Sequence, residues 1–331
     1  MLQFQEMNAK WKEQLENLIT DPKELGLADS PLCLLPMAVT PYYASLIRQK
    51  DFSDPIFAQC VPSPQEAQDE RKECDPLCEE KFMPVPGLIR RYPDRAVFLA
   101  SSRCAVQCRH CTRRWQIING KPLDYRTTLP DVLSYLKKNP DIEEIIVSGG
   151  DPLALEDFEI EEILSAFKNS GIKVMRLGTR FPATLPMRVT KELVSILAKY
   201  QPLWIQTHFN HPWEITKEAK EALALFCEAG LPINNQTVLL KGVNDNVETL
   251  EKLFRLLIQN RVRPYYLFQC DKIPGTERFW TPLEKGVEIE RALRARLSGI
   301  AIPTFILDQP ANDGKIPLSF ATAEKNELKI F

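Results

Sequence analysis

The sequence predicts an α/β fold, namely a partial (β/α)6 barrel of the TIM type. Two observations support this prediction. From about residue 96 onward, short β-rich runs alternate with longer amphipathic helices, which is typical of a parallel sheet. Polar and glycine-rich residues cluster after the strands, as they do at the functional face of parallel β/α barrels. A doubly wound sheet also fits the alternation, and only the polar loops favour the barrel.

Six short runs are expected to form the strands of this barrel. They span 96–102, 143–150, 173–179, 203–209, 232–240 and 263–270. The helices between them place apolar residues three and four positions apart, as in LEKLFRLL at 250–257. Thr190 and Thr216 precede two of these helices and are expected to cap them.

Three regions are expected along the chain. Residues 1–95 form an N-terminal helical cap region, residues 96–302 form the partial barrel, and residues 303–331 form a C-terminal segment that starts as a strand. Within the cap, one amphipathic helix is predicted over about 5–19. The charged connector at 66–81, EAQDERKECDPLCEEK, is interpreted as a solvated loop.

Composition excludes several functional classes. The 331 residues carry 42 Lys and Arg against 44 Asp and Glu, a net charge of −2, so no basic surface for nucleic acid or a membrane is expected. No apolar run approaches the roughly 20 residues of a membrane helix. The N-terminus, MLQFQEMNAKWKEQLENL, is amphipathic and does not have the pattern of a signal peptide. A cytoplasmic location is therefore expected.

Nine cysteines cannot all pair within one chain, and three of them cluster. Cys104, Cys108 and Cys111 have the spacing C-x3-C-x2-C and come directly after the first expected strand. Three thiolates on one loop can bind three irons of a [4Fe–4S] cube and leave the fourth iron open. Zinc with His110 as a fourth ligand is one alternative, and three reduced thiols without a metal are another.

This cysteine motif after a first barrel strand resembles the radical S-adenosylmethionine superfamily. The resemblance implies that the open iron chelates S-adenosylmethionine, which is cleaved to a 5′-deoxyadenosyl radical. Gly149, Gly150 and Asp151, at the end of the second strand, are similar to the motif that binds the methionine amino group. His110 lies where the superfamily often places an aromatic side chain near the adenine.

Seven further segments narrow the resemblance to the lysine 2,3-aminomutase family. They are collinear with that family from roughly residue 37 to 320. The resemblance implies an isomerase that converts L-lysine to β-lysine through the adenosyl radical and a pyridoxal phosphate aldimine. The similar segments are 37–47, 84–99, 108–114, 207–212, 234–245, 268–271 and 306–317.

The same resemblance implies a binding site for pyridoxal 5′-phosphate. Lys315 matches the lysine that holds this cofactor, although Ala-Asn-Asp at 311–313 replaces the family's usual glycine run. Arg91, Arg95 and Gln236 match residues that surround the cofactor, while ordinary surface ion pairs are the alternative for the two arginines.

Substrate specificity follows from three matched positions. Arg113 matches the arginine that binds the substrate carboxylate, for which a planar guanidinium is suited. Asp271 and Asp308 match the two acids that receive the side-chain ammonium of lysine. A glutamate-specific relative would need cationic or neutral groups at these two positions, so lysine is favoured and glutamate remains the alternative substrate.

The chain departs from the family's long forms in its zinc ligands. Asn246 occupies the internal ligand position and no cysteine follows Cys270, so any homo-oligomer is expected to form without an interface zinc. The short form resembles the branch that supplies β-lysine for modification of elongation factor P. An external reductant of the flavodoxin or ferredoxin type is implied. His208, His211, Cys74 and Cys78 receive no role.

Two rival functions come from other classes. One is a radical enzyme that modifies a protein or a tRNA without pyridoxal phosphate. The other is a non-catalytic module that binds an iron–sulfur cluster or zinc.

Overall fold

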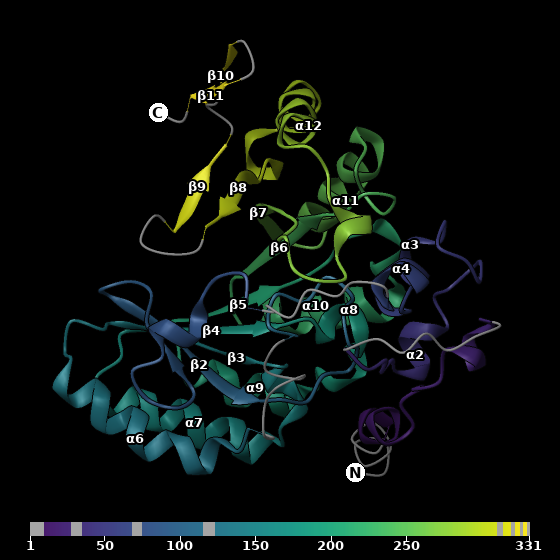
Figure 1. The fold of residues 1–331 in the computed structure, drawn as a ribbon. Helices are drawn as coiled ribbons and strands as arrows, with labels where there is room; N and C mark the ends of the chain where they lie inside the picture. Colours follow the sequence, from purple (N-terminus) through teal and green to yellow (C-terminus); the bar gives the residue numbers. More distant parts are fainter. Residues whose placement is uncertain are drawn as a thin grey trace.

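The computed structural model describes residues 10–27, 35–67, 75–114, 123–309, 314–318, 322–324 and 327–329. Their main feature is one curved sheet whose strands follow one another in sequence order from β1 to β9 (Figure 1). Seven neighbouring strands are parallel. They are β2 (Arg95–Ser101), β3 (Glu144–Gly149), β4 (Val174–Thr179), β5 (Leu203–Thr207), β6 (Ile233–Leu239), β7 (Val262–Gln269) and β8 (Thr304–Asp308).

This strand order decides between the two predicted architectures. A doubly wound sheet reverses its strand order at an internal switch point, whereas every parallel strand here pairs with its sequence neighbours. The partial barrel is therefore confirmed, with a seventh parallel strand after six β/α units. Two short strands flank it antiparallel, β1 (Leu88–Ile89) beside β2 and β9 (Lys315–Pro317) beside β8. The sheet stays open between these two edges.

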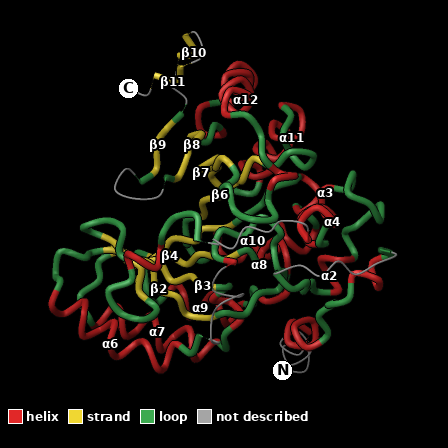
Figure 2. Tube along the Cα trace, viewed as in Figure 1, coloured by secondary structure: helices red, strands yellow, loops and turns green. Residues whose placement is uncertain are grey.

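Six helices follow the first six parallel strands and cover the outer face of the sheet (Figure 2). Thr190 and Thr216 cap two of them as predicted, each accepting a backbone N–H three residues ahead. The helices are α6 (Tyr125–Lys138), α7 (Asp157–Asn169), α9 (Lys191–Ala198), α10 (Lys217–Glu228), α11 (Val247–Gln259) and α12 (Leu283–Arg296).

Strand register separates an apolar outer layer from a polar interior. One row of paired residues is entirely apolar and buried against the helices, and it consists of Phe98, Val147, Leu177, Ile205, Ile233 and Val262. Because side chains alternate along a strand, the neighbouring rows face inward. These inward residues include Arg176 and Trp204, which pair with each other and line a central cavity.

The cap region is built from short elements. Residues 10–16 are helical, as part of the helix expected over 5–19, whose first five residues lie outside the described part. The other elements are η1 (Pro22–Leu25), α2 (Pro41–Ala44), α3 (Pro55–Cys60), α4 (Pro64–Ala67) and η2 (Glu79–Phe82). Tyr43 and Phe57 pack with Val106 in a second apolar cluster, so the cap rests directly on the loop that follows β2.

The remaining elements are short. They are η3 (Pro152–Ala154), α8 (Phe181–Thr184), η4 (Pro186–Arg188), η5 (Pro212–Glu214), η6 (Glu277–Phe279), η7 (Gly299–Ala301), β10 (Thr322–Glu324) and β11 (Glu327–Lys329). The sheet extends across both expected region boundaries, since β1 precedes residue 96 and β8 and β9 follow residue 302. The boundaries themselves remain a prediction.

The interpretation of 66–81 as a solvated loop is wrong at both ends of that segment. Residues 68–74 lie outside the described part, but Glu66 and Glu79 are buried. Glu66 accepts a hydrogen bond from Arg109 Nε at 3.1 Å, and Glu79 pairs with Arg113. Ionised carboxylates are buried when a cation pairs with them, and here the partner is distant in sequence.

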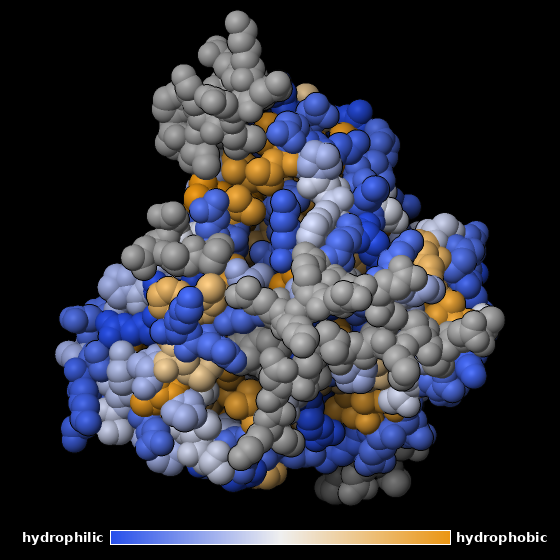
Figure 3. All heavy atoms as spheres, viewed as in Figure 1, coloured by the Kyte–Doolittle hydropathy of each residue, from blue (hydrophilic) through white to orange (hydrophobic). Residues whose placement is uncertain are grey.

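The outer surface over α6, α7 and α12 is mainly hydrophilic, whereas apolar atoms are visible beside β7 and β8 near the open edge of the sheet (Figure 3). None of the described helices has the length and apolar character needed to cross a lipid bilayer.

Close packing of α12 on β8 supports the strand that carries Asp308. A Cβ atom at Gly286 would lie 2.1 Å from Cζ of Phe305. Alanine in place of glycine usually stabilises a helix by about 0.5–1 kcal/mol, but here the phenyl ring must shift. We expect Gly286→Ala to lower the free energy of unfolding in urea by about 1–3 kcal/mol.

The matched control is Gly299→Ala, because nothing lies within 4 Å of a Cβ built there. Equal stability of the two variants would contradict the packing of Phe305 against α12.

Candidate active site

A cavity of about 740 Å³ lies inside the open barrel. Inward-facing strand residues and the loops after the strands form its walls. All fourteen residues predicted from the sequence for the site line this one cavity. They are Arg91, Arg95, Cys104, Cys108, His110, Cys111, Arg113, Gly149, Gly150, Asp151, Gln236, Asp271, Asp308 and Lys315.

The three clustered cysteines line the cavity from the loop after β2. Backbone hydrogen bonds hold this loop against the cap, such as Gln107 N to Ala38 O at 2.7 Å. Burial, together with the neighbouring Cys111, holds the pKa of the Cys104 thiol well above its usual range. Burial also raises the pKa of Cys111 to about 11. Metal binding would replace these thiol protons by a cation.

The donor set fits a [4Fe–4S] cluster. In such a cube each cysteine binds a different iron, so the thiols need not converge on one point. Within the described ranges, no three His, Cys, Asp or Glu side chains converge on one metal position. His110 Nε2 contacts Asn210 Nδ2.

His110 offers a hydrogen-bond donor toward the cavity. Asn210 Oδ1 accepts from Val238 N, which fixes the amide so that Nδ2 donates to His110 Nε2 at 3.2 Å. The proton of the neutral ring therefore lies on Nδ1, a buried atom that has no partner among the described residues. Burial holds the pKa of His110 well below its usual range, so the ring stays neutral. A nucleobase nitrogen would satisfy this donor.

The glycine pair at the end of β3 lies against the cysteine loop. Gly149 has a φ of +123°, and a Cβ there would lie 2.4 Å from Ser101 O. A Cβ on Gly150 would lie 2.5 Å from Arg103 O. Only glycine fits at this contact, so the backbone of β3 can form one wall of the cavity next to the cysteines.

Asp151 follows this glycine pair, and its carboxylate accepts hydrogen bonds from other residues of the protein. It accepts hydrogen bonds from Leu153 N, from Thr179 Oγ1 and from Arg180 N. Burial raises its pKa to about 7 in spite of these donors. Asp151 thus joins the ends of β3 and β4, and the contact predicted for it with a ligand remains a prediction.

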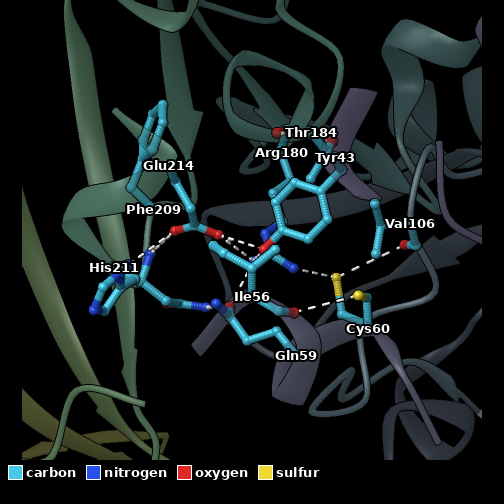
Figure 4. A network of polar contacts seen from close by, with 12 residues as sticks. Tyr43, Ile56, Gln59, Cys60, Val106, Arg180, Thr184, Phe209, His211 and Glu214 are labelled. Atoms are coloured by element: carbon cyan, nitrogen blue, oxygen red, sulfur yellow. Dashed lines mark hydrogen bonds and ion pairs between the residues drawn. The ribbon is translucent and has the colours of Figure 1, made fainter. Parts of the chain in front are cut away.

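Arg180 connects the cysteine loop to the cap, and sequence reasoning missed it. Its Nη1 donates to Cys108 Sγ at 2.6 Å, while Nη2 donates to Glu214 Oε1 at 2.7 Å and to Gln59 Oε1 at 2.6 Å. Figure 4 shows this network, in which Tyr43 also donates to Glu214 at 2.7 Å. Its only sequence signal is its place directly after β4, at the edge where the other functional loops lie.

Lys315, the first residue of β9, lines the same cavity. Its Nζ is 3.0 Å from Asp308 Oδ2, and Arg91 Nη1 is 3.1 Å from Asp308 Oδ1. The Arg91 and Asp308 side chains are only 8% and 7% exposed, so the surface ion pair considered for Arg91 is wrong. These contacts link the segment before β2 to β8 and β9 across the open side of the sheet.

Arg113 and Asp271 line the same cavity. Arg113 forms a two-point ion pair with Glu79, with Nε to Oε2 at 3.0 Å and Nη2 to Oε1 at 2.8 Å. Burial, together with the nearby carboxylates of Asp308 and Glu79, raises the pKa of Asp271 to about 7. Among the described residues, no cation forms an ion pair with the Asp271 side chain.

The contacts of Arg95 and Gln236 give less support to their predicted place around the cofactor. Arg95 lies over the ring of Tyr92 and is 2.8 Å from Asp94, in a partly exposed pair that matches the surface alternative. Gln236 faces the cavity from β6.

The residues left without a role are also placed. His208 lines the cavity, and burial lowers its pKa to about 4. His211 caps η5, where its Nδ1 accepts from Trp213 N. Cys78 precedes η2, and Cys74 lies outside the described residues.

Comparisons with known proteins agree with this geometry. The Radical SAM superfamily model matches residues 99–257. The L-lysine 2,3-aminomutase of Fusobacterium nucleatum is 44% identical over 289 residues, which cover 86% of this chain and 67% of that protein. The L-lysine 2,3-aminomutase of Clostridium subterminale is 42% identical over 313 residues, covering 92% and 74%.

A relative with a different substrate is nearly as similar. The glutamate 2,3-aminomutase of Clostridioides difficile is 40% identical over 323 residues, covering 94% of this chain and 76% of that protein. Among solved structures, Streptococcus suis SuiB bound to precursor peptide SuiA has a TM-score of 0.50 and 16% identity, covering 65% of this chain and 49% of that one. This likeness concerns the fold alone.

The Arg180 network generates a stability prediction. The Glu214 side chain is fully buried, so removing its cation leaves a buried charge with neutral donors only. We expect Arg180→Gln to lower the free energy of unfolding of the cofactor-free protein by about 3 kcal/mol in urea titrations.

The double variant Arg180→Gln with Glu214→Gln removes both charges and should recover part of the loss. A single variant that loses less than about 1 kcal/mol would mean that the pair is effectively solvated.

Proposed function

Because the chain belongs to the lysine 2,3-aminomutase family of the radical SAM superfamily, we propose that it converts L-lysine to β-lysine. The observation that carries this proposal is a single cavity lined both by the three cysteine thiols and by Lys315. A radical generated beside the cysteines and an amino acid held beside Lys315 would share the same space.

The chain is an isomerase whose cofactors are a [4Fe–4S] cluster, S-adenosylmethionine and pyridoxal 5′-phosphate. Together these groups supply a radical that removes a substrate hydrogen atom and a conjugated system that stabilises the unpaired electron while nitrogen migrates. Radical SAM enzymes need a reductant. We propose a flavodoxin- or ferredoxin-type donor for this one.

The part of the cavity lined by the cysteines would hold the [4Fe–4S] cluster and S-adenosylmethionine. Cys104, Cys108 and Cys111 are the proposed cluster ligands, and the backbone of Gly149 and Gly150 forms the adjacent wall. The orphaned Nδ1–H of His110 supports a role for this residue in holding the adenine.

Lys315 would attach pyridoxal phosphate through its Nζ, which must first lose a proton to act as a nucleophile. Asp308 Oδ2, 3.0 Å away, would accept that proton. Arg91 would hold the other Asp308 oxygen in position. Arg95 and Gln236 are the further residues proposed around this cofactor, since both line the cavity.

Charge pairing supports lysine as the substrate. The guanidinium of Arg113 would bind the α-carboxylate. Of the two predicted ammonium acceptors, Asp308 is already shared by Arg91 and Lys315, whereas Asp271 has no ion-pair partner among the described residues. We therefore propose Asp271 as the main acceptor of the ε-ammonium. A carboxylate at the end of the substrate side chain would instead face the negative charges of Asp271 and Asp308.

The decisive experiment is anaerobic incubation with L-lysine, S-adenosylmethionine and dithionite, followed by separation of α- and β-amino acids. β-Lysine is the expected product, and parallel incubation with L-glutamate should give no β-glutamate. Rearrangement of glutamate but not lysine would support the alternative substrate. Cys108→Ala should abolish turnover, whereas Cys227→Ala, a cysteine outside the cavity, should leave it unchanged.

Lys315 generates a second test that does not depend on turnover. Borohydride reduction of the enzyme loaded with pyridoxal phosphate should fix the cofactor on Lys315, as shown by peptide mass spectrometry. Lys315→Ala should lose the label, and Lys272→Ala should keep it, since Lys272 does not line the cavity. Labelling of any other lysine in the wild-type enzyme would refute the assignment.

The pKa of Asp271 predicts how lysine binding depends on pH. A carboxyl with a pKa of about 7 is protonated below that pH, whereas the ε-ammonium of lysine stays charged. We therefore expect the Kd for lysine to rise about fivefold from pH 7 to pH 6 and to change little from pH 8 to pH 9. Calorimetry without S-adenosylmethionine, where no turnover occurs, measures this.

Asp271→Asn should bind lysine more weakly above pH 7 and should flatten the profile between pH 6 and pH 8. Asp141→Asn, which changes an exposed acid outside the cavity, is the control. An unchanged profile in Asp271→Asn would assign the titration to another group.

A further inference from the structure

We propose that Glu79 determines substrate specificity: it positions the guanidinium of Arg113, and its negative charge excludes amino acids whose side chain ends in a carboxylate. This inference rests on the proposed function and extends it to a residue of the charged connector. Glu79 lines the cavity from η2, outside the barrel strands.

The contact between Glu79 and Arg113 has the geometry of a positioning interaction. Two parallel N–H···O contacts of 3.0 and 2.8 Å join one edge of the guanidinium to both carboxylate oxygens. The Glu79 side chain is 5% exposed, whereas that of Arg113 is 24% exposed and reaches the cavity. The pair thus fixes the plane of the guanidinium before any substrate binds.

The same contact leaves one edge of Arg113 available. Nε and Nη2 are used by Glu79, while Nη1 has only a long contact of 3.5 Å with Ser148 Oγ. A substrate carboxylate would therefore meet Arg113 through Nη1.

Glu79 also belongs to a group of three acids. Its charge acts on Asp271, as does that of Asp308, and Asp308 in turn acts on Arg113. All four side chains line one cavity, so they form a compact array with Asp271 as the acid that lacks an ion-pair partner among the described residues. An incoming ammonium relieves the repulsion among these carboxylates, whereas an incoming carboxylate adds to it.

The backbone before Glu79 is strained. Cys78 has φ 50° and ψ 38°, a left-handed conformation that is unfavourable for a residue with a Cβ. Local contacts hold the turn in place, with Glu80 N donating to Asp75 Oδ2 at 3.0 Å and Arg90 N to Phe82 O at 2.8 Å. Strain of this kind persists where the surrounding structure requires it, and here it directs a charged side chain into the cavity.

The test is calorimetry of lysine and glutamate binding to the enzyme loaded with pyridoxal phosphate, without S-adenosylmethionine. Glu79→Gln keeps the size and polarity of the side chain but removes its charge. We expect the Kd for lysine to rise about tenfold, because Arg113 loses its fixed partner, and the Kd for glutamate to fall. The preference for lysine over glutamate should drop at least tenfold.

Glu80→Gln is the matched control, because it removes the same charge from the neighbouring, exposed position. It should leave both affinities within twofold of wild type. Glu79→Asp keeps the charge but shortens the side chain. It should weaken lysine binding while glutamate stays excluded.

A purely structural role would give a different result. If Glu79→Gln weakens lysine and glutamate binding by the same factor, the specificity role is overturned. If Glu79→Gln does not fold, Glu79→Asp decides, because tighter glutamate binding in that variant would show that charge is not the determinant. Failure of the wild-type enzyme to bind lysine would instead refute the proposed function, so the two failures are distinguishable.

Discussion

The ion-pair chain from Arg91 through Asp308 to Lys315 joins the two free edges of an open sheet. Together with the hydrogen bond from Arg91 Nη2 to Gln309 O, it links the segment before β2 to the strands β8 and β9 on this side. The Arg91 and Asp308 side chains are nearly buried, so each charge is stable only beside the opposite charge. The same contacts that link the edges of the sheet therefore place Lys315 inside the cavity.

Other charged side chains of the cavity are also paired with opposite charges. Arg113 pairs with Glu79, and Asp308 pairs with both Arg91 and Lys315. Such internal pairing keeps the site stable before any ligand arrives. It also means that ligands bind by adding to existing pairs. Asp271, which has no ion-pair partner among the described residues, is where a cation is most needed. A substrate with a carboxylate at one end and an ammonium at the other matches this arrangement.

Local sequence patterns predicted the strands, the Thr190 and Thr216 caps and the cysteine loop, because each depends on neighbouring residues. The set of residues that share the cavity came from family resemblance. Glu79 was missed because an acid in a charged segment has the same local pattern whether it is solvated or buried, and its partner Arg113 lies 34 residues away. Arg180 was missed for the same reason, since its contacts span the cap and the barrel.

The consecutive order of the strands also determines when each part of the site can form. Each parallel strand pairs with the strand made just before it, so the sheet grows by short-range contacts along the chain. The cysteine loop and the glycine turn of β3 lie within one early β/α unit and can come together while the rest of the barrel is incomplete. The pocket around Lys315 joins residues more than 200 positions apart. The metal-binding part of the site therefore depends on short-range contacts, whereas the vitamin B6 pocket depends on contacts that span most of the barrel.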